Sequence, residues 1–589
     1  MTRTYDAPLK DIRSAIDRAA AVSGLDSMPD AREALGDLTD SVLENAARFA
    51  REVLSPLNPV GDRTPARCTP EGVVTSPGFA DAYSRFRDDG WTSLGAPADD
   101  GGMGLPTLVA VATGEMWGAA NLAFAMCPEV AVGAIDALRH HATASLREVY
   151  LPRVVSGEWT AAMSLTEPQA GSDLSTLRTR AEPQPDGSWR LFGRKIYISW
   201  GDHDFADNIV HLVLARTPDA PEGLKGISLF LVPKKVPAAD GTLTPNDIRA
   251  ISLEHKMGIR ASPTCAMVLG EREGAAGWLV GKQHEGLACM FTMMNVMRIG
   301  VGVHSLGIAE RALQLARAHA HERVQGRGAG GAQRPIIEHA DVRRMLLTMK
   351  ALTQAARGLV YTAAATLDVS QLSPDEARRH AAANRVSLLT PVVKAWISDT
   401  AVEVASLGVQ IHGGSGYVDD AEISQIYRDA RIGPIFEGTN YIQAQDLLGR
   451  KIIRDHGSAL NALLEEIDSA ASALPADDPR LAALGSQLSR NCTKLREAAA
   501  AITQASATDA ELIGSVAHHF LQWLGVLAGG WQWSLFAHAA LRADPSAETQ
   551  SVLDTAAFYA AHVLPRALTH EALVRAGSAP ITRATVASI

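Results

Sequence analysis

Paired cysteines, zinc-ligand spacings and long basic runs are all missing from this chain of 589 residues. Its cysteines are scattered singly, at Cys68, Cys127, Cys265, Cys289 and Cys492. Because disulfide frameworks and structural zinc sites need paired or clustered cysteines, neither is expected, and we predict no bound metal ion. The 65 Asp and Glu residues outnumber the 55 Lys and Arg residues, which gives a net charge of −10. Phosphate neutralisation needs clustered positive charge, so we expect no nucleic-acid partner.

The N-terminus lacks the uninterrupted apolar segment of a secretory signal. Its first residues, MTRTYDAPLKDIRSAI, mix charges of both signs, so a cytoplasmic location is expected. One long stretch, between Glu511 and Arg542, contains no charged side chain. A membrane span needs about 20 predominantly apolar residues, whereas His, Gln and Ser side chains and Gly529-Gly530 interrupt this stretch. We therefore expect a helix buried between other helices, with no membrane insertion.

Aromatic residues are also scarce, at 5%, whereas Ala and Leu dominate the apolar set and favour helices. Apolar residues recur with helical spacing up to about residue 160, as in 41–54, and again from 285 onward. Between these regions Asp186-Gly187 separates two extended runs, which is typical of a β-hairpin. Further strand-like runs cover 208–216 and 225–234. We predict regions in the order α, β, α, α.

Two segments in the β region carry groups suited to a flat ligand that bears phosphates. The segment AAMSLTEPQAGSDLS (161–175) offers Thr166, Ser172 and backbone N–H groups around Gly171. Such a loop can cradle the polar edge of a ring together with a pyrophosphate. The segment KIYISWGD (195–202) has a Tyr and a Ser two residues apart on an expected strand. Because side chains alternate along a strand, the two hydroxyls are expected on the same face.

Two further segments lie in the second helical region. In QIHGGSGY (410–417) a glycine pair would allow a backbone or a phosphate to approach closely. The pair follows an expected helix and not a strand, so it is not the dinucleotide-binding fingerprint. In IFEGTNYIQ (435–443), Glu437 follows an apolar run, and Thr439 or Asn440 can N-cap the next helix. A carboxylate at such a junction is either a helix-start charge favoured by the dipole or a partly desolvated base.

The order and spacing of these segments resemble the acyl-CoA dehydrogenase flavoprotein family from about residue 40 to 455. The resemblance is carried by short motifs: MSLTEPQAGSD, KIYIS in place of the family's K-x-W-I-T/S, HKMGIRASPT, HERVQGR, QIHGGSGY and IFEGTNYIQ. The additional N-terminal helices and the helical extension after about 456 resemble the larger subgroup of this family. That subgroup includes the 3-methylmercaptopropionyl-CoA dehydrogenases and the broad-range fatty acyl-CoA dehydrogenases.

The resemblance implies an α+β, mostly α fold of four domains. These are an N-terminal α-helical domain (1–160), a central β-barrel-like domain with flavin and substrate contacts (161–282), a C-terminal four-helix domain with the catalytic glutamate (283–456) and an additional C-terminal helical domain (457–589). The resemblance also implies FAD as the cofactor, an acyl-CoA substrate, an electron-transfer flavoprotein as the electron acceptor, and a homodimer.

The family's residue roles carry over to matching positions of this chain. Glu437 would remove the α-proton of the acyl thioester, the flavin N5 would accept the β-hydride, and a trans-2-enoyl-CoA would result. The residues implied to bind FAD are Leu165, Thr166, Gly171, Ser172, Tyr197, Ile198, Ser199, Arg323, Gln410, Gly413, Gly414 and Thr439. The residues implied to contact the substrate are Ser172, Asn295, Arg298 and Gly438.

Some positions depart from the family's usual pattern, and the sequence leaves alternatives for the substrate and for the function. Tyr197 stands where Trp is commonest, and Asn295 stands where many relatives carry Asp. The substrate is either 3-methylmercaptopropionyl-CoA or a short-to-long fatty acyl-CoA. An acyl-CoA oxidase is an alternative enzyme, and a non-catalytic, flavin-bearing nucleic-acid-binding relative is an alternative of a different class.

Overall fold

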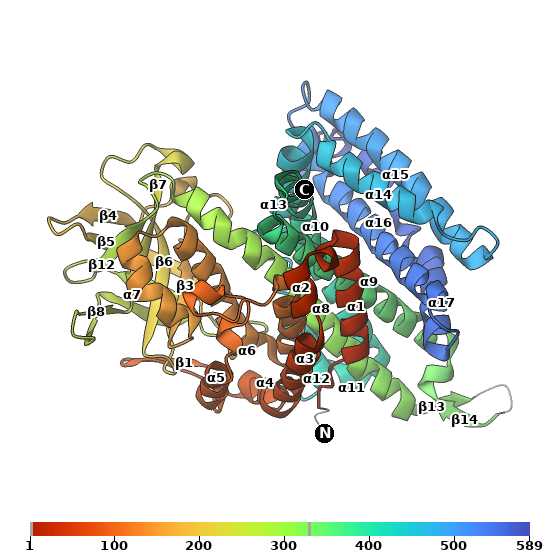
Figure 1. Cartoon of the computed structure of the whole chain (residues 1–589), viewed down its shortest axis with the longest axis horizontal. Coiled ribbons are helices and arrows are strands. Elements are labelled where there is room, and N and C mark those ends of the chain that lie inside the picture. The colour runs from red at the N-terminus through yellow and green to blue at the C-terminus, as the bar shows by residue number, and fades with distance from the viewer. Residues whose placement is uncertain (1–3, 328–330, 589) are drawn as a thin grey trace. The chain divides into compact units, whose positions relative to one another are not determined.

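The computed structural model describes residues 4–327 and 331–588 (Figure 1). Two compact units make up this chain. One comprises Asn45–Gly300 with a short N-terminal segment that includes Tyr5, and the other comprises Pro8–Glu44 and the chain from Val301 onward. We call them the β unit and the helical unit. The helix α3 (Asp37–Phe49), which covers most of the expected helix 41–54, continues from one unit into the other.

One eight-stranded sheet forms the centre of the β unit, with the strand order β10-β11-β5-β12-β7-β6-β3. Its strands are β3 (Trp159–Ser164), β4 (Arg180–Pro183), β5 (Trp189–Ser199), β6 (Asn208–Arg216), β7 (Ile227–Pro233), β10 (Ile248–Leu253), β11 (Thr264–Leu269) and β12 (Ala275–Val280). Strand β4 pairs with both β5 and β6, which brings the sheet into a small barrel. The predicted hairpin at Asp186-Gly187 is confirmed, because β4 and β5 pair antiparallel across it.

The β unit also contains helices, some of which contribute to the core beside the sheet. They are α4 (Ser55–Arg63), α5 (Phe79–Asp88), α6 (Thr107–His141), α7 (Ala144–Val155) and the first part of α8 (Gly286–Glu322). Apolar side chains of α6, α7, β3 and β6 form one buried cluster with Met290, Met293 and Met297 of α8. The methionine stripe of α8 is thus core packing.

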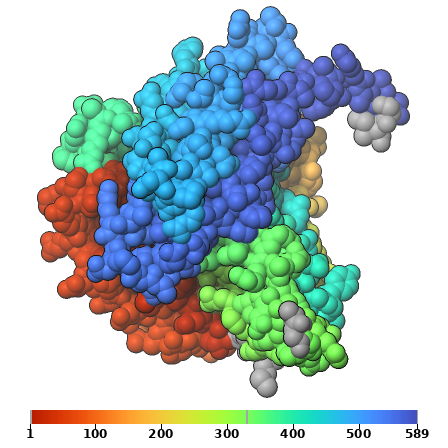
Figure 2. Space-filling model, turned by 90° about the vertical axis from the view of Figure 1, so that its right-hand side faces the viewer, coloured from red at the N-terminus to blue at the C-terminus, as the bar shows by residue number. Residues whose placement is uncertain are grey.

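Long helices dominate the helical unit (Figure 1). The helices of this unit include α1 (Leu9–Ser23), the rest of α8, α9 (Ala340–Leu372), α10 (Glu376–His412), α12 (Glu422–Ala430), α13 (Asn440–Gln445), α14 (Ser458–Ser472), α15 (Pro479–Ala505), α16 (Leu512–Arg542), α17 (Ala547–Phe558) and α18 (Arg566–Arg575). The C-terminal helices, coloured blue, form much of the face shown in Figure 2. The predicted α+β, mostly α fold is confirmed.

Helix α16 contains the uncharged stretch noted in the sequence. Within residues 4–327 and 331–588, three helices, α6, α8 and α16, are long and apolar enough to cross a membrane, but 83%, 56% and 72% of their most apolar windows are buried within the protein. In α16 the indole N–H groups of Trp523 and Trp533 donate to Asn491 Oδ1 (2.9 Å) and Ala351 O (3.0 Å). The glycine Gly525 leaves room for Trp396 of α10, whose ring a Cβ atom would meet at 2.3 Å. The prediction of a helix buried between other helices is confirmed.

All five cysteines lie within the described residues, and all are free thiols. Four are buried and Cys68 is half-buried. Burial raises the pKa of each thiol, to about 12 for Cys265 and Cys492. Among the described residues, no group of three or more His, Cys, Asp or Glu side chains is arranged to hold a metal ion.

Candidate active site

The loop after β3 is fastened to strand β5 by a buried lysine. Lys195, fully buried on β5, donates its Nζ to Leu165 O (3.0 Å), to Leu214 O (2.8 Å) and to Glu167 Oε1 (2.9 Å). Three acceptors match the three N–H bonds of an ammonium group. The backbone N–H of Ile196 also donates to Thr166 O at 2.9 Å. The predicted flavin residues Leu165 and Thr166 are thus held directly beside β5.

Glu167 completes this buried network. Its Oε1 accepts hydrogen bonds from the backbone N–H of Thr179 (3.0 Å) and from Thr179 Oγ1 (2.5 Å), and its Oε2 accepts from the backbone N–H of Arg178 (2.8 Å). Burial alone would raise the pKa of Glu167, but Lys195 and these hydrogen bonds lower it to about 2. Burial lowers the pKa of Lys195 to about 8, against the opposing effect of Glu167. Both groups are therefore ionised at pH 7.

The end of β5 departs from a regular strand at the residues predicted to contact the flavin. The pairing of β5 with β11 shifts register between Lys195 and Ile198, and Tyr197 adopts a left-handed φ of 59°. The simple alternation that would place the hydroxyls of Tyr197 and Ser199 on the same face is therefore interrupted, because a β-bulge adds a residue to the strand. Tyr197 is 60% exposed, whereas Ile198 is buried and Ser199 half-buried.

The remaining predicted residues of the β unit differ in exposure. Gly171 and Ser172 lie on an exposed turn, and a Cβ atom at Gly171 would meet nothing within 4 Å. On α8, Asn295 is exposed, whereas Arg298 is only 6% exposed. The exposed aromatic ring, the half-buried hydroxyls of Thr166 and Ser199, and the open turn at Gly171 fit the requirements of a flat, polar-edged ring with a phosphate-bearing tail.

In the helical unit, Glu437 lies on a strained turn. Its φ of 55° is left-handed, as is the φ of 79° at Gly438. For a residue other than glycine this backbone costs about 1–3 kcal/mol, and it persists only where surrounding contacts enforce it. Gln443, fully buried, supplies two such contacts, because its Nε2 donates to the carbonyl oxygens of Glu437 (3.1 Å) and Gly438 (3.2 Å).

The next two residues start helix α13 and close the turn. Thr439, one of the two candidate N-caps in the sequence, is the N-cap, because its Oγ1 accepts from the backbone N–H of Ile442 at 3.3 Å. The backbone N–H of Asn440 donates to Pro434 O at 3.0 Å. The Asn440 side chain is buried, and its Oδ1 accepts from Lys394 Nζ at 2.9 Å. The Glu437 turn is therefore fixed at both ends by polar groups inside the helical unit.

A second group of predicted residues gathers where α8 and α10 end. The imidazole rings of His319 and His412 stack with centroids 4.2 Å apart, which brings the ends of these helices together. Gly413 ends α10 with a left-handed φ of 62°. Four predicted residues, Arg323, Gln410, Gly413 and Gly414, are exposed there, and a Cβ atom at either glycine would meet nothing within 4 Å.

Three residues that hold these turns were not assigned a role from the sequence: Glu167, Lys195 and Gln443. Each lies inside a motif already quoted, in TEP, KIYIS or TNYIQ. Lysine and glutamate are almost never fully buried unless they are paired. These structural roles could therefore have been found in the sequence by looking for a charged or amide side chain at a position that strand or helix periodicity places in the interior.

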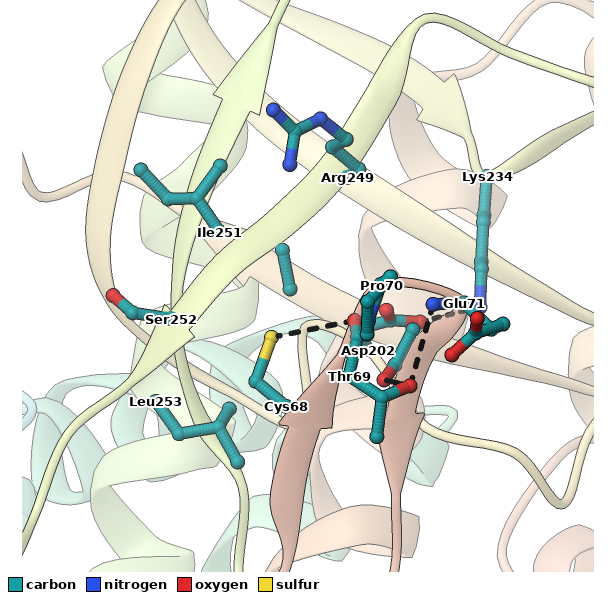
Figure 3. A pocket seen from close by; sticks show the side chains of 12 residues that line it. Cys68, Thr69, Pro70, Glu71, Asp202, Lys234, Arg249, Ile251, Ser252 and Leu253 are labelled. Carbon is teal, nitrogen blue, oxygen red and sulfur yellow. Dashed lines mark hydrogen bonds and ion pairs between the residues drawn. The ribbon is translucent and has the colours of Figure 1, made fainter.

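The β unit also contains a pocket that includes none of the predicted site residues (Figure 3). It has a volume of about 560 Å³ and lies between the strands β1 (Arg67–Thr69) and β2 (Gly72–Val74) and strand β10. Its polar groups largely satisfy one another. Lys234 pairs with Asp202, and Thr69 Oγ1 donates to Gly72 O at 2.9 Å. No function is assigned to it.

The chain matches four family domains. These are the acyl-CoA dehydrogenase N-terminal domain at 39–158, the middle domain at 162–271, the C-terminal domain at 284–452, and the acetyl-CoA dehydrogenase C-terminal-like domain at 463–585. It is 43% identical to the 3-methylmercaptopropionyl-CoA dehydrogenase of Ruegeria pomeroyi over 95% of this chain and 96% of that protein. It is 33% identical to the broad-specificity linear acyl-CoA dehydrogenase FadE5 of Mycobacterium tuberculosis over 90% of each chain.

A solved structure shows the same fold. Caenorhabditis elegans ACDH-11, determined in complex with C11-CoA, matches with a TM-score of 0.80 and 22% identity over 96% of this chain and 92% of that chain. The chain belongs to the acyl-CoA dehydrogenase family, and it is an oxidoreductase. Members of this family bind FAD, which confirms the predicted cofactor. These enzyme relatives do not favour the alternative of a non-catalytic, nucleic-acid-binding flavoprotein.

The buried ion pair yields a prediction about stability. Replacing Lys195 by Met leaves the carboxylate of Glu167 buried without its counter-charge, which should lower the free energy of unfolding by about 3–5 kcal/mol. The double variant Lys195→Met, Glu167→Gln should regain part of this loss. The stabilisation by Glu167 should be fully present above its unfolded pKa of about 4.3 and disappear as the pH falls through about 2.

Urea unfolding of the FAD-loaded protein measures these changes. The control is Arg180→Met, which removes an exposed ion pair with Glu182 on the neighbouring strand β4 and should cost about 0–1 kcal/mol. A Lys195→Met variant no less stable than Arg180→Met would show that the buried pair does not hold the loop.

Proposed function

We propose that this enzyme removes two hydrogens from the Cα–Cβ bond of an acyl-CoA thioester and releases a trans-2-enoyl-CoA. Glu437 takes the α-proton. Bound FAD supplies the acceptor for the β-hydride. The observation that carries the proposal is the strained turn at Glu437, because strain enforced by surrounding contacts clusters at functional sites.

The residues around Glu437 have distinct parts in this proposal. An α-proton beside a thioester is only weakly acidic, so its removal needs a positioned base and donors that stabilise the developing enolate charge. Gln443 and Asn440 restrict the turn, which limits the positions that the Glu437 carboxylate can take. The chain's role at this step is therefore to hold one carboxylate in a defined place and to accept one proton.

Two relatives support different substrates. The relative at 43% identity is named for 3-methylmercaptopropionyl-CoA, and the relative at 33% identity for linear acyl-CoAs of broad length. Both matches extend over at least 90% of each chain. We infer that 3-methylmercaptopropionyl-CoA is the preferred substrate and that fatty acyl-CoAs are the second candidates. We further propose that an electron-transfer flavoprotein reoxidises the reduced enzyme.

Replacement of Glu437 by Gln tests the base. The variant should keep its yellow FAD but lose about 10²–10⁴-fold in the rate of anaerobic flavin bleaching by acyl-CoA, because an amide cannot accept the α-proton. Stopped-flow absorbance measures this rate. As a control, Asp420→Asn removes an exposed carboxylate of the same unit and should leave the rate unchanged. Normal bleaching by the Glu437→Gln variant would exclude Glu437 as the base.

A substrate panel tests specificity and the electron acceptor. Anaerobic bleaching should be fastest with 3-methylmercaptopropionyl-CoA, and slower with butanoyl-, octanoyl- and palmitoyl-CoA. In air and without an added acceptor, the enzyme should form little hydrogen peroxide. Sustained peroxide production would instead identify an acyl-CoA oxidase, and faster bleaching by the fatty acyl-CoAs would reverse the substrate order.

We also propose a homodimer in which the exposed ends of α8 and α10 contact FAD that is bound mainly by the partner chain. Beside Gly413 and Gly414, this surface exposes two apolar residues, Tyr417 and Val418, of which Tyr417 is 86% exposed. Exposed apolar residues close to an open glycine pair fit a surface that a second chain covers.

Sedimentation equilibrium should give twice the chain mass of 62.5 kDa. The double variant Tyr417→Asp, Val418→Asp should be monomeric and poor in FAD, because charge is introduced into the contact. The control Leu568→Asp alters an exposed apolar residue of α18 and should stay dimeric. A monomeric wild-type protein that retains FAD would contradict the proposal.

A further inference from the structure

A chain of hydrogen bonds links the C-terminal helices to the Glu437 turn. Gln522, on α16, donates its Nε2 to Asp399 Oδ2 at 2.6 Å. Asp399, on α10, accepts at its Oδ1 from Asn440 Nδ2 at 2.9 Å. Asn440 in turn closes the turn by donating its backbone N–H to Pro434 O at 3.0 Å. All four residues belong to the helical unit.

Asp399 is the central member of this chain, and its surroundings make its hydrogen bonds important. Burial raises the pKa of Asp399, whereas the hydrogen bond from Asn440, the nearby His518, the hydrogen bond from Gln522 and the charge of Lys394 lower it. A half-buried carboxylate such as Asp399 has lost part of its water and is stabilised by donors at both oxygens. Asn440 supplies the donor at Oδ1 and Gln522 supplies the donor at Oδ2. Gln522 therefore helps to fix the Asp399 carboxylate, and this carboxylate in turn orients the Asn440 side chain.

We propose that Gln522 and Asp399 are positioning residues for Glu437, and that α16 holds the Glu437 turn in place from the C-terminal segment. This inference rests on the proposed role of Glu437 as the base. It gives a catalytic purpose to a segment that lies beyond the family's C-terminal domain, which ends at residue 452. Asn440 connects Asp399 to the Glu437 turn, because its side chain donates to Asp399 and its backbone N–H donates to Pro434 O.

The first experiment removes the donor and keeps the volume. The variant Gln522→Met should show faster hydrogen–deuterium exchange in residues 434–443 of the FAD-loaded protein. Its bleaching rate with saturating 3-methylmercaptopropionyl-CoA, or with octanoyl-CoA, should fall about 10–100-fold, because small displacements of a base are costly. The dissociation constant of the acyl-CoA should change less than the bleaching rate, because Gly438 is the one residue of the turn that is implied to contact the substrate.

A matched control disturbs the same helix on another side. Asn491→Ala removes the acceptor of the neighbouring residue Trp523, whose Nε1 lies 2.9 Å from Asn491 Oδ1. It should loosen the packing of α16 against α15 without changing exchange in 434–443 or the bleaching rate. This control separates loss of the hydrogen-bond chain from general weakening of the C-terminal helices.

A second variant provides a pH profile. Gln522→Glu places a carboxyl group against Asp399, and two carboxyl groups at this distance share a proton at low pH and repel at higher pH. Its bleaching rate relative to the wild type should therefore fall as the pH rises, whereas the loss in Gln522→Met should be the same at each pH. Lys394 and His518, the charged or titratable groups that face Asp399, are unchanged in all three proteins.

The outcomes distinguish this inference from the proposed function. Unchanged exchange in 434–443 for both Gln522 variants would overturn the positioning role. Faster exchange with an unchanged bleaching rate would also overturn the positioning role, whereas normal bleaching by Glu437→Gln would count against Glu437 as the base. Faster exchange together with slower bleaching, absent in Asn491→Ala, would support both.

Discussion

The left-handed backbone at Glu437 is the constraint on which the interior of the helical unit depends. A carboxylate can be held there only if other groups bind the main chain around it. Gln443 binds the carbonyl groups of the turn, Thr439 caps the helix that follows, and Asn440 ties the turn to α10. Helices α10 and α13 therefore do more than enclose a core, since they provide polar contacts that the strained turn requires.

In the β unit, an irregular loop is held in place by a buried ion pair. The loop that carries Leu165 and Thr166 is irregular, and the carbonyl group of Leu165 needs a donor other than a strand N–H group. The ammonium group of Lys195 supplies this donor. Glu167 balances the charge of Lys195 and accepts a hydrogen bond from the backbone N–H of Thr179. In both units a buried polar side chain holds the backbone of a loop that carries residues of the proposed site.

Much of this arrangement could be predicted from the sequence, because it depends on local patterns. The hairpin at Asp186-Gly187, the N-cap at Thr439 and the buried helix 512–542 follow from turn chemistry, capping preference and apolar periodicity. The bulge at Tyr197 could not be predicted, since strand alternation carries no signal for one added residue. The link from Gln522 to Asp399 joins residues 123 positions apart, and local patterns contain no information on such pairs.

The burial of the native thiols has a practical consequence for spectroscopy of this enzyme. A thiol reacts with maleimides and disulfide probes as its thiolate, and burial both raises the pKa and excludes the reagent. Four of the five thiols are buried, and Cys68 is half-buried. A cysteine introduced at an exposed position such as Leu568 would thus be labelled in preference to the native ones, so site-specific labelling needs no cysteine-free background.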